Sequence, residues 1–301
     1  MCAFERSEKG MKFFMEQEYI LENCKSFEPE HIFECGQCFR WNKQEDGSYV
    51  GIFKQNVIKV KKEDNKIIFT GICNGNIKDE CIEYFDLNTD YEKIKTKLST
   101  IDNYLKTSIE YGTGIRILNQ DLWETLISFI ISANNNIPRI KGIIERISKN
   151  YGKKIVWNNN EYYTFPTPKE LSNASIKDLR ELGLGFRDVR VYETTKIVND
   201  NPNKLKELGE EKDINKLREE LLQFPGVGPK VADCVMLFST LKKLEVFPID
   251  VWVRRVMNEL YIKNEDETKI NKREIENLAR KKYGNLAGIA QQYLFYWRRG
   301  A

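Results

Sequence analysis

The chain contains a single histidine, His31, and no apolar run long enough to cross a bilayer. One histidine cannot by itself support a histidine-based catalytic set, so a structural role is expected for it. The N-terminus lacks the charged, apolar and small-residue order of a signal peptide. We therefore expect a globular enzyme of the cytoplasm, neither exported nor held in a membrane.

Cysteine is scattered and charge is almost balanced. Seven cysteines, an odd number spread over 301 residues, fit reduced thiols better than a disulfide scaffold. Cys35 and Cys38 form a lone C-x-x-C without a second pair or a histidine cluster, so no metal site is expected. The net charge is only +3, so any surface that binds a polyanion must come from local basic clusters.

The pattern of the sequence changes from β-rich to helical near residue 90. Residues 1–10 show no pattern and are predicted to be a mobile leader. Residues 11–90 carry short β-rich runs separated by turns and predict an antiparallel sheet domain, whereas residues 91–301 have helical periodicity. The fold class is therefore α+β. Strands are predicted at 37–41, 49–53, 57–61 and 67–73, and helices at 79–85, 91–98, 103–111, 121–133, 138–150 and 187–199.

A glycine-rich turn separates two helical runs, 214–223 and 230–241. It contains Gly226 and Gly228, and glycine is needed where a backbone turns sharply or approaches another molecule closely. Pro229 suits the first position of the following helix, whose bare N–H groups can hold a phosphate. The stretch at about 213–241 therefore predicts a helix-hairpin-helix that grips a nucleic-acid backbone, a device that many non-catalytic modules share.

Lys230 and Asp250 are the candidates for chemistry. Lys230 lies on the first turn of a helix, where the dipole disfavours a cation and so favours the neutral amine that can attack carbon. The alternative is a solvated lysine that touches phosphate. Asp250 precedes a third helical run, 251–262, and is either an N-cap or a fixed negative charge beside a developing cation. Both roles can hold for the same carboxylate.

These residues resemble a known family. The strings Gly-Val-Gly-Pro-Lys-Val-Ala-Asp-Cys, from Gly226 to Cys234, and Pro-Ile-Asp-Val, from Pro248, look like the 8-oxoguanine DNA glycosylases of the eukaryotic type, within the helix-hairpin-helix glycosylase superfamily. The resemblance implies that Lys230 is the nucleophile and Asp250 its catalytic partner. The implied enzyme flips 8-oxoguanine out of duplex DNA, excises it, forms a Schiff base and nicks the strand by β-elimination.

Two further segments carry the resemblance on the side of the opposite strand. Asn-Asn-Asn-Ile-x-Arg resembles the loop that fills the gap left by an extruded base, which implies that Asn134 contacts the orphaned base and Arg139 reads its edge. Taken alone, three asparagines at a helix end indicate a cap and turn. A second glycine-punctuated turn implies Phe186 as the wedge and Arg187 as a second reader of cytosine. The family commonly has tyrosine at this wedge, so a hydroxyl contact is lost here.

The base pocket is implied by residues from three distant segments. Gly36, in a string that resembles Gly-Gln-x-Phe-Arg-Trp, would offer its carbonyl to N7–H, which 8-oxoguanine has and guanine lacks. Cys234 and Phe295 are implied as opposite walls, and Gln291 as the reader of the pairing edge. Trp252 stands where eukaryotic members commonly have histidine, beside the DNA phosphates. Without the resemblance, Cys234 and Gln291 would be assigned to ordinary packing helices.

The resemblance also implies the surroundings of the reaction. The partner is double-stranded DNA, the protein acts as a monomer at the nucleoid, and no cofactor or metal is required, although hairpin carbonyls can share a monovalent cation with a phosphate. The four-cysteine cluster of the endonuclease III branch is absent near the C-terminus. Two alternatives stay open: a glycosylase of the same superfamily for another damaged base, and a non-catalytic DNA-binding hairpin module.

Overall fold

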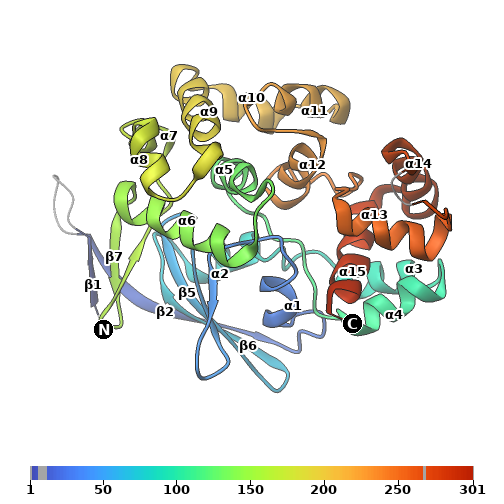
Figure 1. The fold of residues 1–301 in the computed structure, drawn as a ribbon. Helices are drawn as coiled ribbons and strands as arrows, with labels where there is room; N and C mark the ends of the chain where they lie inside the picture. The colour runs from blue at the N-terminus through green and yellow to red at the C-terminus, as the bar shows by residue number, and fades with distance from the viewer. Residues whose placement is uncertain (1, 6–11, 267–268, 301) are drawn as a thin grey trace.

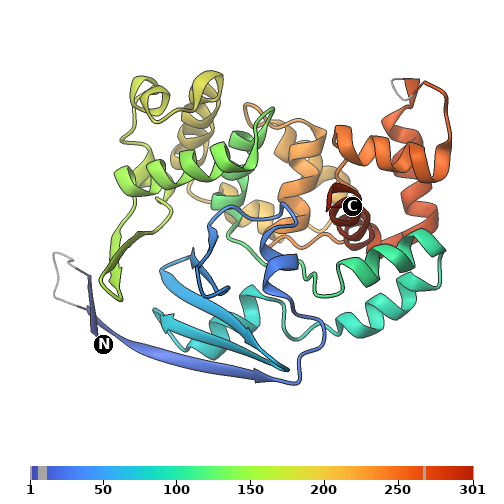
Figure 2. The same ribbon diagram turned by 60° about the horizontal axis from the view of Figure 1, so that its bottom comes forward.

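The computed structural model describes residues 2–5, 12–266 and 269–300. It contains an antiparallel sheet followed in sequence by a mostly helical body (Figure 1). Seen from the second direction, the sheet lies along one side of the molecule and the helices cover the other (Figure 2). The predicted α+β plan, with a helix-hairpin-helix in the helical body, is confirmed.

The sheet has six antiparallel strands in the order β1-β2-β6-β5-β4-β3. Two-residue turns join β4 to β5 and β5 to β6, and Lys54 and Asp64 adopt the left-handed conformation that such tight hairpins use. The strands are β1 (Cys2–Glu5), β2 (Lys12–Glu22), β3 (Trp41–Lys43), β4 (Tyr49–Phe53), β5 (Asn56–Glu63) and β6 (Lys66–Ile72). A separate hairpin consists of β7 (Lys154–Trp157) and β8 (Asn160–Tyr163).

The helical body is built around α5 (Leu122–Ser132). The Asp121 side chain accepts from the N–H of Glu124 at 2.8 Å and caps this helix. Its residues are apolar on nearly every side, so α5 is buried between α6, α9 and α12. The other helices are α1 (Pro29–Phe33), α2 (Ile77–Tyr84), α3 (Tyr91–Ser99), α4 (Asn103–Tyr111), α6 (Ile137–Tyr151), α7 (Pro168–Leu171), α8 (Ile176–Glu181), α9 (Asp188–Asp200), α10 (Lys204–Glu210), α11 (Ile214–Leu222), α12 (Pro229–Phe238), α13 (Val251–Met257), α14 (Lys272–Tyr283) and α15 (Ala287–Gly300), with short 3₁₀ turns η1 (Gly185–Arg187) and η4 (Gly284–Leu286) and a π-helical turn η2 (Asn258–Ile262).

A buried glutamine, Gln37, joins the two parts. Its Nε2 donates to the carbonyl of Arg116 at 2.8 Å, and its Oε1 accepts from the N–H of Leu118 at 2.9 Å. The Gln120 side chain donates in turn to the carbonyl of Gln37 at 2.8 Å. These bonds fix the backbone next to Gly36 against the segment that leads into α5.

Several predicted boundaries are wrong, for local reasons. The strand predicted at 37–41 begins only at Trp41, because the backbone carbonyl of Gln37 accepts from the Gln120 side chain and not from a neighbouring strand. The helix predicted at 230–241 ends at Phe238, where Thr240 donates to the carbonyl of Gln120 at 2.8 Å. The third helical run, by contrast, has its predicted bounds of 251 and 262, with α13 ending at Met257 and the π-helical turn η2 completing it.

The N-terminal segment contains a strand that the sequence analysis did not predict. Cys2–Glu5, inside the predicted mobile leader, forms β1 and pairs with β2. Residues 1 and 6–10 of that leader lie outside the described residues.

A substitution at Gly51 in β4 tests the packing of the sheet against Trp41. A Cβ at this position would lie 2.2 Å from a ring atom of Trp41, and that ring is stacked on Phe33 with centroids 4.1 Å apart. We expect Gly51→Ala to lower the free energy of unfolding by about 1–3 kcal/mol, measured by urea denaturation, since the ring must leave a packed core.

The matched control is Gly209→Ala in α10, where a Cβ would meet nothing within 4 Å. Alanine is the better helix former, so this variant should be as stable as the original chain or slightly more stable. Equal midpoints for the Gly51→Ala variant and the original protein would contradict the packing argument.

Candidate active site

The hairpin between α11 and α12 presents a helix start without a side-chain cap. Gly226 has a φ of +86°, and a Cβ there would lie 2.6 Å from Cδ of Arg190, so both backbone and space require glycine. Gly228 is the N-cap of α12, faces open space and has Pro229 after it. The first N–H groups of α12 have no side-chain cap and can bind a phosphate oxygen.

Lys230 is half-buried in the first turn of α12. Its Nζ lies 5.2 Å from the ring centre of Phe129, which comes from α5. Cys234 lies one turn further along the same face. Burial raises the pKa of the Cys234 thiol to about 11, and the charge of Lys230 offsets this only in part. Cys234 is therefore a neutral, apolar neighbour of the amine at neutral pH.

Asp250 is the N-cap of α13. Its side chain accepts from the N–H of Val253 at 2.8 Å, which holds the carboxylate at the helix start. The segment before α13 brings Asp250 to the same cleft as Lys230, since the two residues line the same pair of adjacent cavities. The amine and the carboxylate thus face one space.

The cleft consists of an outer hollow and an inner cavity. The outer hollow has a volume of about 700 Å³ and the inner cavity about 40 Å³. The inner cavity is large enough for a water molecule but far below the roughly 300–1,000 Å³ of a typical ligand site. Lys230, Asp250, Gly36 and Phe295 line both spaces.

The predicted base pocket comes together in the inner cavity. Gly36, Cys234, Gln291 and Phe295 all line it. Gly36 has a φ of +82°, a conformation that favours glycine, and a Cβ there would touch Phe295 at 3.5 Å. Gln291 is buried and Phe295 half-buried on α15. Residues from the loop after α1, from α12 and from α15 therefore meet at this point.

The asparagine loop, Asn134 to Asn136, caps a helix and also borders the cleft. Asn136 caps α6 by accepting from the N–H of Arg139 at 3.0 Å, and Asn135 donates to the carbonyl of Ile131 at 3.1 Å. Asn134 has a φ of +51°, is exposed, and lines the outer hollow. Two asparagines therefore fix the loop while the third presents its side chain at the cleft.

Arg187 is buried instead of facing the cleft. Its Nε and one terminal nitrogen donate to the carbonyl of Ala133 at 2.9 and 2.6 Å, and that terminal nitrogen also reaches the carbonyl of Asn134 at 2.6 Å. Its other terminal nitrogen donates to the carbonyl of Leu184 at 3.2 Å. Most of its donors thus hold the asparagine loop in place in this structure.

A basic cluster surrounds the second glycine turn. The Phe186 side chain is 54% exposed, and the guanidinium groups of Arg187 and Arg190 lie 4.2 and 5.1 Å from its ring centre. Arg139 is exposed and donates to the carbonyl of Gly183 at 3.4 Å. Burial, followed by the charges of Arg139 and Arg190, lowers the pKa of Arg187. Such crowding of cations creates a local surface suited to a polyanion.

The site has members that the sequence analysis missed. Phe129, Gln292 and Arg299 line the cleft beside the predicted residues. Arg299 follows Phe295 by four residues on α15, so the helical spacing was a usable signal. Gln292 is the immediate neighbour of Gln291, and that spacing places it off the same helical face. Trp252, which was predicted, is 51% exposed and lines the outer hollow.

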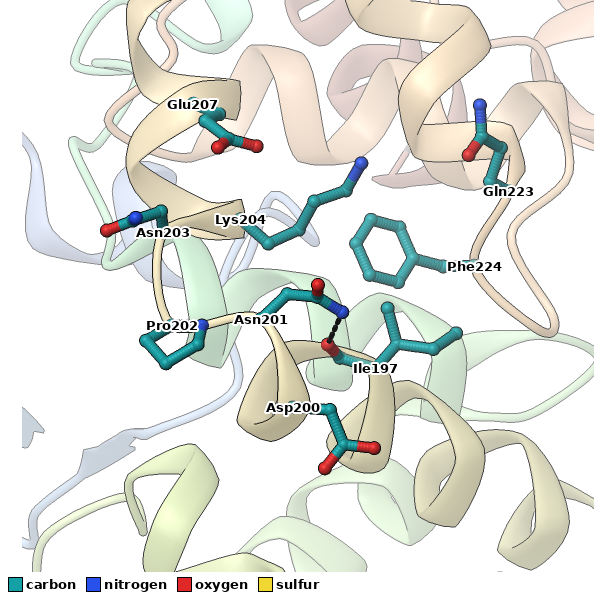
Figure 3. A pocket seen from close by; sticks show the side chains of 9 residues that line it. All are labelled: Ile197, Asp200, Asn201, Pro202, Asn203, Lys204, Glu207, Gln223 and Phe224. Carbon is teal, nitrogen blue, oxygen red and sulfur yellow. Dashed lines mark hydrogen bonds between the residues drawn. The ribbon is translucent and has the colours of Figure 1, made fainter.

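Another hollow, of about 560 Å³, lies behind the hairpin (Figure 3). Among its charged and polar side chains, Lys204 pairs with Glu220, and Asn201 donates to the carbonyl of Ile197 at 2.9 Å. It contains none of the predicted site residues. The predicted site residues lie instead in the cleft between α12, α13 and α15.

Neither a metal site nor a membrane span is found in the described part of the chain. Within it, no group of three or more His, Cys, Asp or Glu side chains could hold a metal ion. Cys35 and Cys38 are free, buried thiols that donate to the carbonyls of Ile32 and Phe33. None of the helices in residues 2–5, 12–266 and 269–300 combines the length and apolar character needed to span a bilayer.

Comparisons with known proteins agree with the resemblance. Residues 19–126 match the N-terminal domain of 8-oxoguanine DNA glycosylase, and residues 127–283 match the HhH-GPD superfamily of base excision DNA repair proteins. A probable N-glycosylase/DNA lyase of Methanothermobacter thermautotrophicus is 36% identical over 72% of this chain and 73% of its own length. The N-glycosylase/DNA lyase of Saccharomyces cerevisiae is 32% identical over 88% of this chain and 81% of its own length.

A solved structure supports the same assignment. The Clostridium acetobutylicum 8-oxoguanine glycosylase/lyase, in complex with double-stranded DNA containing cytosine opposite 8-oxoguanine, superimposes with a TM-score of 0.88. The two chains are 42% identical, and the match covers 96% of this chain and 98% of that one. The chain belongs to the 8-oxoguanine DNA glycosylase family, within the HhH-GPD superfamily of base excision DNA repair proteins.

Proposed function

We propose that this protein is a bifunctional DNA glycosylase and lyase that flips 8-oxoguanine out of duplex DNA and excises it. The observation that carries the proposal is the convergence of Lys230 and Asp250 on one cleft whose inner wall contains Gly36 and Gln291. Relatives named N-glycosylase/DNA lyase, and the related enzyme solved with DNA that contains 8-oxoguanine, support the same substrate. An extruded base is the form in which such an enzyme reaches its target atom.

Asp250 and Lys230 have different roles in the reaction. As the bond between C1′ and N9 breaks, its electron pair leaves with the base, which takes up a proton, and positive charge develops on the sugar. The Asp250 carboxylate, held by the N–H of Val253, stabilises that charge. The neutral amine of Lys230 attacks C1′ and gives up one proton, which balances the proton that the base takes up. The C1′–O4′ bond then breaks, O4′ takes up a proton from water, and C1′ is left double-bonded to nitrogen as a protonated Schiff base. Loss of a C2′ proton then breaks the C3′–O bond and nicks the strand.

Gly36 supplies the discrimination between damaged and normal guanine. Its carbonyl accepts a hydrogen bond from N7–H of 8-oxoguanine, whereas N7 of guanine is an acceptor and is repelled. The left-handed backbone at Gly36 allows the carbonyl to be directed at the base. Cys234 and Phe295 cover the two faces of the base, and Gln291 binds its pairing edge.

The basic cluster and the asparagine loop bind the opposite strand. Asn134 fills the gap left by the extruded base, Phe186 wedges into the stack, and Arg139 reads the orphaned cytosine. Arg187 joins that reading when part of its guanidinium leaves the loop carbonyls. Phe186 lacks the tyrosine hydroxyl that is common in the family, so the preference for cytosine rests on the arginines.

DNA phosphates bind at the hairpin and beside Trp252. The amides that follow Gly226 and Gly228 hold one phosphate, and hairpin carbonyls can share a monovalent cation with it. The chemistry needs no other cofactor. We propose that the protein works as a monomer on the genomic DNA of the nucleoid.

Lys230→Gln tests the nucleophile. We expect borohydride to trap the original protein covalently on DNA that contains 8-oxoguanine, because the Schiff base is reducible, and we expect the variant to lose trapping by at least about a thousandfold. Gel analysis of the covalent complex measures this. Lys177→Gln, at a lysine of α8 whose side chain is 85% exposed, should trap as the original does.

A Lys230→Gln variant that still forms the covalent complex would refute the assignment. Failure of the original protein to release any base, with intact and salt-sensitive DNA binding, would instead support a non-catalytic hairpin module.

The Asp250→Asn variant distinguishes the helix-capping role of Asp250 from its electrostatic role in excision. Asparagine caps helices as well as aspartate does, so the stability of the variant should match that of the original protein. Base excision should fall by about 10²–10³-fold, because the charge facing the developing cation is gone. Single-turnover kinetics measure the excision rate and thermal unfolding measures the stability, both on the same preparation. Unchanged excision would show that Asp250 serves only as a cap.

A further inference from the structure

Gln292 has an unsatisfied acceptor at the base pocket. It follows Gln291 on α15, is only 3% exposed and lines the inner cavity. Its Nε2 donates to Oε1 of Gln291 at 2.9 Å. Its Oε1 is buried and has no hydrogen-bond partner within residues 2–5, 12–266 and 269–300. The two side chains therefore form a hydrogen-bonded pair, and the acceptor oxygen of Gln292 is the unpaired group in it.

A buried carbonyl oxygen without a donor is unfavourable unless a ligand or a water supplies one. The inner cavity of about 40 Å³ has room for a water, and a base that enters displaces it. The orphan oxygen therefore marks a position where the ligand should present an N–H group.

The hydrogen bond within the pair also fixes what Gln291 can do. Oε1 of Gln291 accepts from Gln292 and keeps one lone pair, while its Nε2 remains a donor. A guanine-type pairing edge presents O6 as an acceptor, then N1–H and the exocyclic 2-amino group as donors. Gln291 can satisfy O6 and N1–H, which leaves the 2-amino group without an acceptor from this residue.

We propose that Gln292 is a specificity-determining residue: it orients the Gln291 amide and accepts a hydrogen bond from the 2-amino group of the excised purine. This inference rests on the proposed excision of 8-oxoguanine. It assigns recognition of the pairing edge to two adjacent glutamines. A purine that carries the 8-oxo group but lacks the 2-amino group leaves Oε1 of Gln292 unpaired, and the site rejects it.

Two substrates isolate this contact. Duplexes carry 8-oxoguanine or 8-oxohypoxanthine opposite cytosine, which differ only in the 2-amino group, and excision is measured under single-turnover conditions. We expect the original protein to excise 8-oxohypoxanthine roughly fivefold to tenfold more slowly, the range for one hydrogen bond. Gln292→Met, which keeps the length of the side chain without polar atoms, should bring the ratio of the two rates close to one.

Gln292→Glu is the matched variant, because it keeps an acceptor and loses the donor to Gln291. It should retain the preference for the substrate with the 2-amino group even if both rates fall. An unchanged ratio in Gln292→Met, or a ratio near one in the original protein, would overturn the proposal.

Borohydride trapping on abasic DNA separates a folding defect from a loss of specificity, since that reaction needs Lys230 but no base. Both Gln292 variants should trap abasic DNA as the original protein does, and loss of trapping in both would make Gln292 a structural residue and overturn the proposal. If the original protein releases no 8-oxoguanine, the proposed function itself fails. A normal release with an unaltered ratio in Gln292→Met refutes only the role of Gln292.

Discussion

The hydrogen bonds of buried Gln37 are the constraint on which the cleft depends. Gln37 is fully buried, and its amide is bonded on both sides to the segment that contains Arg116 and Leu118. Each of these groups, left unpaired, would cost about 1–3 kcal/mol, so the loop that carries Gly36 has one favourable position. That position lies against Phe295 of α15. Discrimination at N7 needs a carbonyl held to within a fraction of an ångström, and a packed amide network supplies that rigidity.

The inner cavity beside Gly36 is too small for a purine. The inner cavity of about 40 Å³ cannot contain a purine, so entry of the base requires at least one wall to move. Phe295 is half-buried, whereas Cys234 is buried in α12 and Gly36 precedes the fully buried Gln37, so Phe295 is the least enclosed of the three walls. Arg187, which is predicted to read the opposite strand, is held instead by hydrogen bonds to the carbonyls of Ala133 and Asn134.

The sequence predicted local structure better than long-range contacts. The helix start at Lys230 and the N-cap at Asp250 were predictable because a glycine hairpin and a capping carboxylate are local signals. The catalytic roles of both residues, and the role of Gly36, stay predictions that rest on the resemblance. The false strand at 37–41 has the composition of β structure, but the side chain of Gln37 bonds to backbone 79 and 81 residues away. The burial of Arg187 likewise depends on carbonyls more than fifty residues distant. Gln292 was missed because a polar residue on a packing helix becomes informative only when its buried oxygen proves unpaired.

A net charge of +3 is compatible with binding DNA because the positive charge is concentrated. Lys230 and Arg299 are the cations among the residues that line the outer hollow, and Asp250 is the anion. Burial keeps Cys234 neutral, with a pKa of about 11, so the thiol adds no negative charge to the cleft. Arg139, Arg187 and Arg190 form a second group of cations around Phe186, and this group also attracts a polyanion.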